Sequence, residues 1–376
     1  MSSFQTSPGT RDILPPHAGR WRALVQVFAD GVESAGYQNI IPPMFEDLGV
    51  FQRLGDATDV VTKEMYDFMD KGGRHIALRP EHTASVCRAL AQHRPTPPWK
   101  VWYSGPNFRY ERPQAGRYRQ FDQVGIEVLG VDDSQLDVEV IALGWDFYKA
   151  IGLSKVSLIV NSLGDAGDRG KYIEALGAYF KTHSDTLSEQ ALATLGRNPL
   201  RVLDSKRPQD AAAIAGAPTI GAFLSTDAAA HFAAVCAGLD SLNIPYVVNE
   251  RLVRGLDYYT HTTFEFVHHK LGAQSGIGGG GRYDGLMEKL GGQSLSGIGY
   301  GIVKRFVSNS ARVISIDLSK PDNEIESVGH ISCDLTDESA VTHAFKQISE
   351  KYQQIDILCA NAGIVPSWSR LSETNF

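Results

Sequence analysis

Hydrophobic and polar positions follow two different periods in the N-terminal part of the chain. Between positions 21 and 32, apolar residues recur at spacings of three and four, which predicts an amphipathic helix that ends at Gly36. A short β-like run follows at 37–43. A further strand at 76–80 leads into a second helix that begins at 81–83.

The longest strands are predicted at 100–111 and 119–130, on either side of a turn-rich linker that contains Pro113 and Gly116. Two strands joined in this way predict an antiparallel hairpin with a long polar tip.

Residues 165–240 are alanine-rich and have a helical period, so we interpret them as a helical insertion. Strand character returns at 244–249 and 258–267. Dominant antiparallel strands with helices predict an α+β fold for a first domain over residues 1–302.

Beyond residue 302 the pattern changes. An apolar strand at 311–318, an amphipathic helix at 338–352 and another apolar strand at 355–359 follow one another. This order is typical of parallel α/β structure. We therefore expect residues 303–376 to form a separate, partial α/β Rossmann-like tail.

Composition and charge exclude several classes of function. The chain has 376 residues, with 36 basic and 43 acidic side chains and a net charge of −7. Such a chain does not coat nucleic acid nonspecifically, so contact with it requires a local basic patch. Four cysteines without a C-x-x-C pair argue against a disulfide framework and a zinc site. Without an apolar leader or a long apolar run, we expect a cytoplasmic protein with no membrane contact and no bound metal.

The predicted hairpin carries most of the candidate chemistry. Four arginines fall within the eleven positions from Arg109 to Arg119. Side chains alternate faces along a strand, so Arg119, Gln123 and Glu127 share one face, and across the hairpin Arg109 and Glu111 share a face too. Such a surface presents guanidinium groups for a phosphate beside an amide and a carboxylate for a small cationic ligand. A solvated, salt-bridged hairpin is the alternative, and spacing alone does not separate the two.

The sequence Glu81-His82-Thr83 stands where a predicted strand meets the start of a helix. A carboxylate and a hydroxyl at this point suit an ammonium group. The alternative is that Glu81 or Thr83 caps the helix N-terminus, which is the simpler interpretation of this motif alone.

A third motif contains Arg254, Gly255, Asp257, Tyr258 and Tyr259. The glycine lets the backbone approach a ligand closely, and the arginine and the acid supply charge. Paired tyrosines are more often packing residues, so this motif alone leaves both interpretations open.

A glycine cluster at 276–285 satisfies G-x-G-x-x-G, but two histidines and Lys270 precede it instead of a buried parallel strand. We therefore reject a dinucleotide site there. We expect the glycines to lie in a strand and to clear space for a bound ligand.

Taken in order, these motifs resemble the catalytic domain of histidyl-tRNA synthetase, a class II aminoacyl-tRNA synthetase. The hairpin resembles motif 2 of that family, and Arg-Gly-Leu-Asp-Tyr-Tyr-Thr at 254–260 and Gly-Gly-Gly-Gly-Arg-Tyr-Asp-Gly-Leu at 278–286 resemble its histidine-specific signatures. The resemblance covers about residues 4–302. It implies an antiparallel sheet of six to seven strands, flanking helices, a helical insertion and a homodimer built near residues 37–43.

The resemblance further implies a reaction. L-Histidine would be activated with Mg²⁺-ATP to histidyl-adenylate, and the acyl group would pass to tRNA(His). Arg109, Glu111 and Arg117 would bind ATP, and Arg109 and Arg254 would be the catalytic arginines at the α-phosphate. The residues implied to bind histidine are Glu81, His82, Thr83, Gln123, Glu127, Arg254, Tyr258, Tyr259 and Tyr283. Members of the family usually carry glycine where this chain has His82.

The resemblance ends at motif 3, which should finish as Gly-x-acid-Arg. Here the chain reads Val303-Lys304-Arg305-Phe306, and the arginine sits one residue early. One residue along a helix is a rotation of about 100°, so Arg305 does not simply take over the contact with the ATP γ-phosphate. The anticodon-binding domain that normally follows is also replaced.

The tail resembles an N-terminal fragment of a short-chain dehydrogenase/reductase. Asp317 and Asp334 stand at positions of NAD-binding acids, and Ala360-Asn361-Ala362-Gly363 matches that family's N-A-G signature. The segment 296–302 fits both families. We therefore hypothesise a chimera joined there, from a gene fusion or from an assembly error.

Two alternative functions remain. The first is the non-catalytic relative of the synthetase that serves as regulatory subunit of ATP phosphoribosyltransferase, which senses histidine and also lacks the anticodon domain. The retained Arg109, Gln123, Glu127 and Arg254 favour the enzyme, because a sensor needs no arginine at an α-phosphate. The second is an NAD-binding reductase fragment, which the missing Tyr-x-x-x-Lys disfavours.

Overall fold

The computed structural model describes residues 4–53, 61, 63–112, 118–153, 155–252, 258–268, 276–292, 313–317, 328–333 and 337–352. The chain divides into two compact units. The first comprises Met1–Val128 and Asp133–Ser294, and the second comprises Leu129–Asp132 and Leu295–Phe376.

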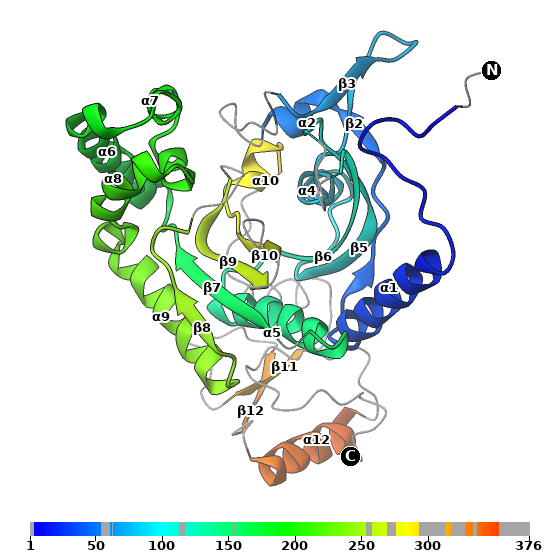
Figure 1. Ribbon diagram of the computed structural model, residues 1–376. Helices are drawn as coiled ribbons and strands as arrows, with labels where there is room; N and C mark the ends of the chain where they lie inside the picture. Colours follow the sequence, from blue (N-terminus) through cyan, green and yellow to red (C-terminus); the bar gives the residue numbers. More distant parts are fainter. Residues whose placement is uncertain are drawn as a thin grey trace. The chain divides into compact units, whose positions relative to one another are not determined.

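The strands of the first unit form three groups, in the orders β1-β5-β6, β10-β9-β7-β8 and β2-β4-β3 (Figure 1). Their bounds are Gln38–Asn39 (β1), Phe45–Asp47 (β2), Tyr66–Met69 (β3), His75–Leu78 (β4), Trp99–Phe108 (β5), Gln120–Leu129 (β6), Val156–Ser162 (β7), Tyr246–Val248 (β8), Thr260–His268 (β9) and Gly276–Arg282 (β10). β9 is antiparallel to both β7 and β10, whereas β1–β5 and β7–β8 are parallel pairs.

The single antiparallel sheet implied by the resemblance differs from this arrangement. Among the described residues, the backbone ladder is interrupted between the group that ends at β6 and the group that begins at β10. A hydrogen bond from the Tyr283 hydroxyl to Glu127 joins the two groups at this place. A mixed α+β fold, as predicted, is confirmed.

The helices are α1 (His17–Ser34), α2 (Leu48–Gln52), α4 (Thr83–His93), α5 (Ser134–Ala150), α6 (Ala166–Thr182), α7 (Glu189–Leu195), α8 (Ala211–Gly216), α9 (Thr226–Ser241) and α10 (Leu286–Lys289). Gly36 follows α1 with a φ of +84°, as expected for a residue just past a helix end.

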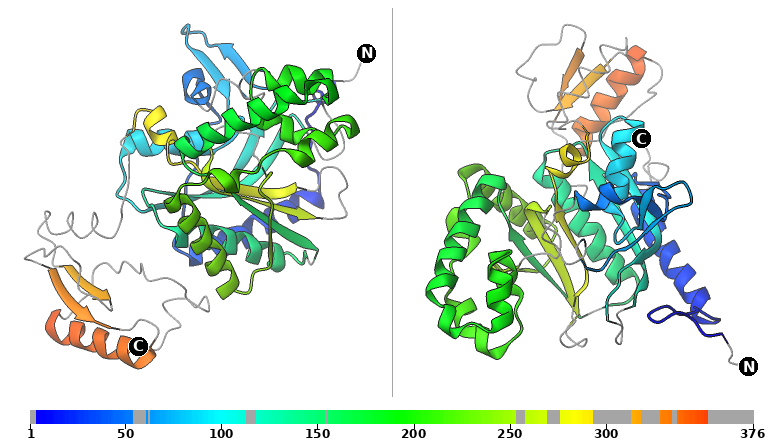
Figure 2. Two further views of the ribbon diagram at one scale, coloured as in Figure 1. Left: turned by 90° about the vertical axis from the view of Figure 1, so that its left-hand side faces the viewer. Right: turned by 90° about the horizontal axis from the view of Figure 1, so that it is seen from above.

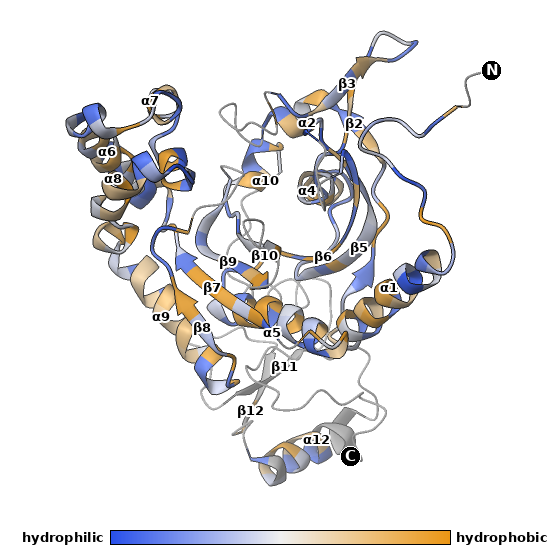
Figure 3. Cartoon of the chain, in the orientation of Figure 1, coloured by the Kyte–Doolittle hydropathy of each residue, from blue (hydrophilic) through white to orange (hydrophobic). Residues whose placement is uncertain are grey.

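Helix α5 joins two hydrophobic cores, and Figure 3 shows its apolar residues beside those of β7 and β8. Ile141 packs with Leu158 of β7 and Leu239 of α9. Leu143 instead belongs to a core with Phe28 of α1 and neighbouring residues. The amphipathic pattern of α5 therefore holds the strands and the flanking helices together.

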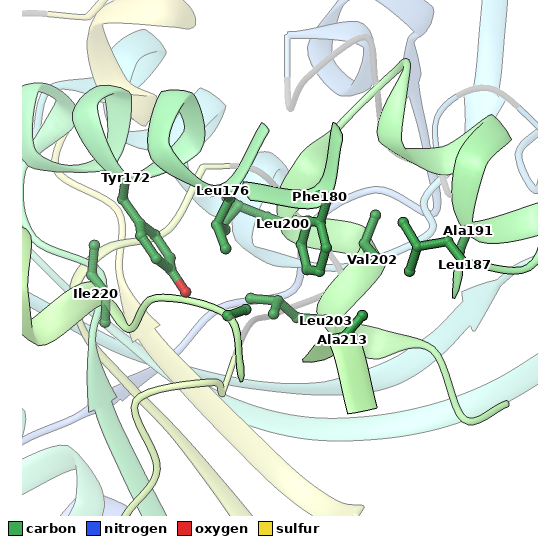
Figure 4. Close-up of a cluster of buried hydrophobic side chains, with 11 residues drawn as sticks. Tyr172, Leu176, Phe180, Leu187, Ala191, Leu200, Val202, Leu203, Ala213 and Ile220 are labelled. Carbon is green, nitrogen blue, oxygen red and sulfur yellow. The ribbon is translucent and has the colours of Figure 1, made fainter. Parts of the chain in front are cut away.

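Helices and short 3₁₀ turns fill the chain from α6 to α9, where the sequence predicts a helical insertion. Tyr172, Leu176 and Phe180 of α6 point into a separate hydrophobic core with residues of the following turns (Figure 4). The residues just before α6 and just before α9 meet at Asp168, whose carboxylate accepts the amides of Asp165 at 3.4 Å and Ser225 at 3.0 Å.

In the second unit, β11 (Val313–Asp317) and β12 (Val328–Ser332) pair in parallel, and α12 spans Glu338–Tyr352 (Figure 2). The sequence predicted β11 and α12 but not β12, and the strand predicted at 355–359 lies outside the described residues. A parallel pair followed by a helix agrees with α/β structure, while the Rossmann-like character of this unit stays a prediction.

Within the described residues, no single helix is both long and apolar enough to span a membrane. One bent pair, 208–223 with 226–241, meets the criterion by length and composition alone. The cysteines among these residues, Cys87, Cys236 and Cys333, are not joined in disulfides.

Candidate active site

The loop between β4 and α4 carries the first group of candidate residues. The carboxylate of Glu81 accepts the backbone N–H groups of Thr83 at 3.1 Å and Ala84 at 2.8 Å, so Glu81 caps the start of α4. The Tyr258 hydroxyl donates to the same carboxylate at 3.2 Å. Burial raises the pKa of Glu81. The capping interpretation of this motif is confirmed, and the cap lies among other candidate side chains.

Glu127 of β6 accepts three hydrogen bonds, as many as Glu81. Its carboxylate accepts hydrogen bonds from the hydroxyls of Thr83 at 2.7 Å, Tyr103 at 3.2 Å and Tyr283. Burial raises the pKa of Glu127 to about 7, with a further rise from the negative charge of Glu81, while the hydroxyl donors oppose the shift. The site therefore holds a second buried carboxylate beside the first.

Tyrosine rings enclose these two carboxylates. Tyr258 and Tyr259 are 4% and 9% exposed, and their ring centroids are 4.7 Å apart. Tyr283 meets Tyr258 edge-on at 5.9 Å. The sequence motif left two roles open for Tyr258 and Tyr259, packing and ligand binding. The structure places both of them, together with Tyr283, around the carboxylates.

Arg109 lies at the end of β5, next to the cap of α4. Its Nε donates to the carbonyl of Pro80 at 3.0 Å, and its guanidinium carbon lies 5.3 Å from the centroid of Phe121. Burial lowers the pKa of Arg109, and the nearby charge of Glu81 raises it. The arginine nevertheless stays charged, so one cation faces the carboxylate site.

Side-chain contacts across β5 and β6 show the register of the hairpin. Asn107 donates from Nδ2 to Oε1 of Gln123 at 2.7 Å, while Tyr103 reaches Glu127. Partners that move in opposite directions along the two strands indicate an antiparallel pair, as predicted. The hairpin tip at 113–117, with Arg117, lies outside the described residues.

An N-terminal segment around Gly9 contacts the hairpin at the start of β6, next to the tip. The carbonyl of Gly9 accepts the amides of Arg119 at 2.8 Å and Gln120 at 3.2 Å. Gly9 has a φ of +81°, and a Cβ there would lie 2.6 Å from the Arg119 side chain. Arg119 in turn donates to the backbone carbonyl of Glu111 at 3.1 Å. The turn-rich N-terminal sequence predicted an irregular segment but not this contact.

The glycines of β10 lie in a strand, as predicted, but the expectation that they clear space for a ligand is wrong. A Cβ at Gly278 would collide with the Tyr148 hydroxyl, and one at Gly280 would lie 2.9 Å from the ring of Phe264. Side chains of the protein itself fill this space, because α5 and β9 pack directly on β10.

An ion-pair network fixes the end of β10 that carries Tyr283. Arg282 donates from Nε to Asp137 of α5 at 2.8 Å, and both side chains are 8% exposed. A ring nitrogen of His231 on α9 lies 2.7 Å from the same carboxylate. Tyr283 is therefore adjacent to a buried anchor.

Sequence reasoning missed this network and two further residues, Tyr103 and Asn107. Strand alternation would have found the latter pair, since both share the Arg109 face of β5. The network joins residues far apart in the chain and has no local signal.

The remaining candidates, Arg254 and the altered motif 3 at 303–306, lie outside the described residues. Among the residues that the structure does describe, no group of three His, Cys, Asp or Glu side chains is arranged to hold a metal ion.

Comparison with known proteins decides the family. Residues 9–305 match the model of the family described as Histidyl-tRNA synthetase. The histidine–tRNA ligase of Nocardia farcinica is 53% identical over 305 residues, which are 80% of this chain and 72% of that protein. The chain belongs to the histidyl-tRNA synthetase family. The histidine–tRNA ligase of Mycobacterium tuberculosis is 52% identical over 306 residues, again 80% of this chain and 72% of the relative.

Solved structures agree with this synthetase family assignment. The apo histidyl-tRNA synthetase of S. aureus matches with a TM-score of 0.63 and 30% identity, over 92% of this chain and 89% of that one. A Bacillus halodurans protein, described as an ATP phosphoribosyltransferase regulatory subunit/histidyl-tRNA synthetase, shares the fold. It has a TM-score of 0.58 and 21% identity, over 92% of this chain and 97% of that one.

The tail matches a second family. Residues 291–375 match the model described as Enoyl-(Acyl carrier protein) reductase, so both resemblances drawn from the sequence are confirmed. The two matched regions overlap at residues 291–305, and this overlap contains the segment 296–302 that fits both families.

Proposed function

We propose that this chain is a histidine–tRNA ligase that joins L-histidine to ATP as histidyl-adenylate and then transfers it to tRNA(His). The observation that carries the proposal is the pair of buried carboxylates, Glu81 and Glu127, enclosed by tyrosines beside the Arg109 guanidinium. Two buried acids and one cation match a substrate that has an ammonium group, an imidazole ring and a carboxylate to be joined to a phosphate.

Glu127 and Tyr259 would bind the imidazole ring of the substrate. A buried carboxylate that loses its partner is left desolvated and unpaired, so the site would reject side chains without a ring N–H. Tyr258 and Tyr283 would form the walls of the pocket.

Glu81 and Thr83 would bind the α-amino group, helped by Gln123. The Asn107 contact supports this role, because a carboxamide held at 2.7 Å has a fixed orientation. The capping bonds of Glu81 occupy both of its oxygens and fix them in the same way.

Arg109, with Glu111 and Arg117, would bind ATP. Nε of Arg109 is used by Pro80, and its two terminal nitrogens suit an α-phosphate oxygen. Arg254 would act on the same phosphate and serve as a second catalytic arginine. A carboxylate oxygen of histidine attacks the α-phosphorus, the bond to the β-phosphate oxygen breaks, and pyrophosphate leaves.

Mg²⁺ would enter as the complex of the ATP substrate. The described residues form no cluster of metal ligands, so they do not fit a resident Mg²⁺ site, and we assign it no step.

We infer a homodimer from exposed apolar residues near the predicted interface. Ile41, Met44 and Phe45 are 84%, 52% and 56% exposed, in and just after the segment 37–43. Exposed apolar residues that adjoin one another are typical of an interaction surface. Sedimentation velocity on the chain and on Ile41→Asp tests this: we expect a dimer that the substitution weakens.

We further infer that residues 1–302 are the catalytic unit and that 303–376 are a reductase-derived tail joined within 291–305. Sequencing reads that cross codons 290–310 test the fusion, and it is wrong if no single read spans the joint.

Histidine-dependent exchange between ATP and pyrophosphate tests the activity. We expect exchange with the purified chain and a loss of at least about a hundredfold in Arg109→Ala, since a charge that stabilises the transition state is removed. An Arg305→Ala variant shows whether that arginine replaces the lost motif 3 contact. Histidine binding without exchange would instead support the regulatory-subunit alternative.

A further inference from the structure

His82 occupies an unusual place in the pocket wall. Its side chain is 1% exposed, and neither Nδ1 nor Nε2 makes a hydrogen bond of normal geometry, although the Asn107 side chain interacts with the ring. An unpartnered buried polar atom costs about 1–3 kcal/mol, so an imidazole at this position calls for an explanation.

The ring of His82 stacks on Tyr103. The two centroids are 4.2 Å apart and the planes differ by 4°. Tyr103 also lies against β6, where a Cβ at Gly125 would collide with the Tyr103 hydroxyl. Stacking on one side and the glycine backbone on the other leave Tyr103 little freedom to move.

The hydroxyl end of the Tyr103 side chain contacts the candidate site. Its hydroxyl donates to Oε1 of Glu127 at 3.2 Å, and the same oxygen accepts from Thr83. His82 therefore reaches the second buried carboxylate through a single intervening side chain.

The imidazole of His82 brings no charge into the pocket. Burial and the adjacent positive charge of Arg79 lower the pKa of His82 to about 3, while Asn107 opposes the shift. A neutral ring does not compete with a substrate for Glu127, and a flat neutral ring stacks well on a phenol.

We propose that His82 is a positioning residue whose stacked ring holds the Tyr103 hydroxyl on Glu127 and so fixes the carboxylate that receives the substrate imidazole. This inference rests on the proposed function. It predicts that histidine affinity depends on a flat side chain at position 82 and not on its two nitrogens.

Isothermal titration with L-histidine alone measures the effect on the whole chain. His82→Ala should raise the Kd about tenfold, since a hydrogen bond to a charged group is weakened. His82→Phe, which keeps a flat ring, should stay within about threefold of the parent. Val86→Ala, at another fully buried residue of α4, controls for general loosening and should leave the Kd unchanged.

A double-mutant cycle tests whether His82 acts through Tyr103. Tyr103→Phe removes the hydroxyl, so His82→Ala should weaken binding by less than about twofold in that background. The KM for ATP in the exchange assay should stay unchanged in the single variants, which a general structural defect would not produce.

Three outcomes would refute the positioning role of His82, and a fourth would refute the proposed function. If His82→Ala binds histidine as tightly as the parent, or if His82→Phe is as weak as His82→Ala, the positioning role is wrong. Equal losses from His82→Ala with and without the Tyr103 hydroxyl also refute it. A parent chain that binds no histidine refutes the proposed function itself.

Discussion

Replacing Glu127 by glutamine tests the electrostatics of the pocket through folding stability. The pKa of this carboxyl is about 7 in the folded chain against 4.5 for an ordinary glutamate, with burial as the main cause. As the pH rises above about 4.5, the unfolded chain loses this proton while the folded chain keeps it. Stability therefore falls with rising pH, and the loss is complete above about pH 7.

The magnitude follows from the pKa difference. A shift of about 2.5 units corresponds to about 3 kcal/mol once both states are ionised. Between about pH 5.5 and pH 8 the penalty grows by about 2 kcal/mol. Glutamine does not ionise, so Glu127→Gln should gain about 2 kcal/mol relative to the parent over this interval. The hydroxyl contacts that glutamine disrupts cost the same at both pH values, so they cancel in the difference.

Urea unfolding followed by tryptophan fluorescence at the two pH values measures this change. Glu174→Gln, which removes an exposed carboxylate on α6, is the matched control and should show no such difference. An effect of Glu127→Gln that is equal at both pH values would show that burial does not raise the pKa, and the electrostatic argument for the pocket would be wrong.

Three further predictions concern the hairpin, the ion-pair network of β10 and the helical insertion. Gly9→Ala should raise the KM for ATP at least about threefold in the pyrophosphate exchange assay, because a Cβ at this position collides with Arg119 and displaces the hairpin. The Kd for histidine should stay unchanged. Asp137→Asn should lower the free energy of unfolding by about 2–3 kcal/mol, measured with urea, because Arg282 loses its buried carboxylate partner and keeps only Asp284 and the carbonyl of Asp133 among the contacts seen here. Asp210→Ala should cost about 2–3 kcal/mol in the same measurement, since its fully buried carboxylate accepts hydrogen bonds from the amide and the hydroxyl of Ser188, the residue before α7. For the two aspartates, a loss below about 1 kcal/mol would contradict the burial argument.

Sequence patterns predicted helices and strands well where the hydrophobic period coincides with residues that typically begin or end such elements. The helix predicted at 338–352 is α12 with the same bounds, and the two hairpin strands agree within a few residues. Alternation along β6 also placed Gln123 and Glu127 on one face, and both side chains contact β5 from there.

Contacts between distant parts of the chain could not be predicted in this way. The Asp137–Arg282 pair and the Gly9–Arg119 bond depend on which elements pack together, and no spacing encodes that choice. The glycine pattern of β10 correctly predicted a strand, but the role predicted for the glycines was wrong. A pattern alone does not distinguish room for a ligand from room for Phe264. The role of His82 is visible only when the ring plane of Tyr103 is known.

Asp168 brings together the two ends of the segment 165–225, which precedes α9, because Asp165 and Ser225 are bonded to its one carboxylate. A segment with adjacent ends and its own hydrophobic core behaves as a removable cassette. A short loop from Gly164 to Ser225 would close the gap without pulling β7 and α9 apart. The chain can therefore be shortened or lengthened within this segment, provided that Arg169 of α6 keeps its hydrogen bond to the carbonyl of Tyr259, at 3.4 Å.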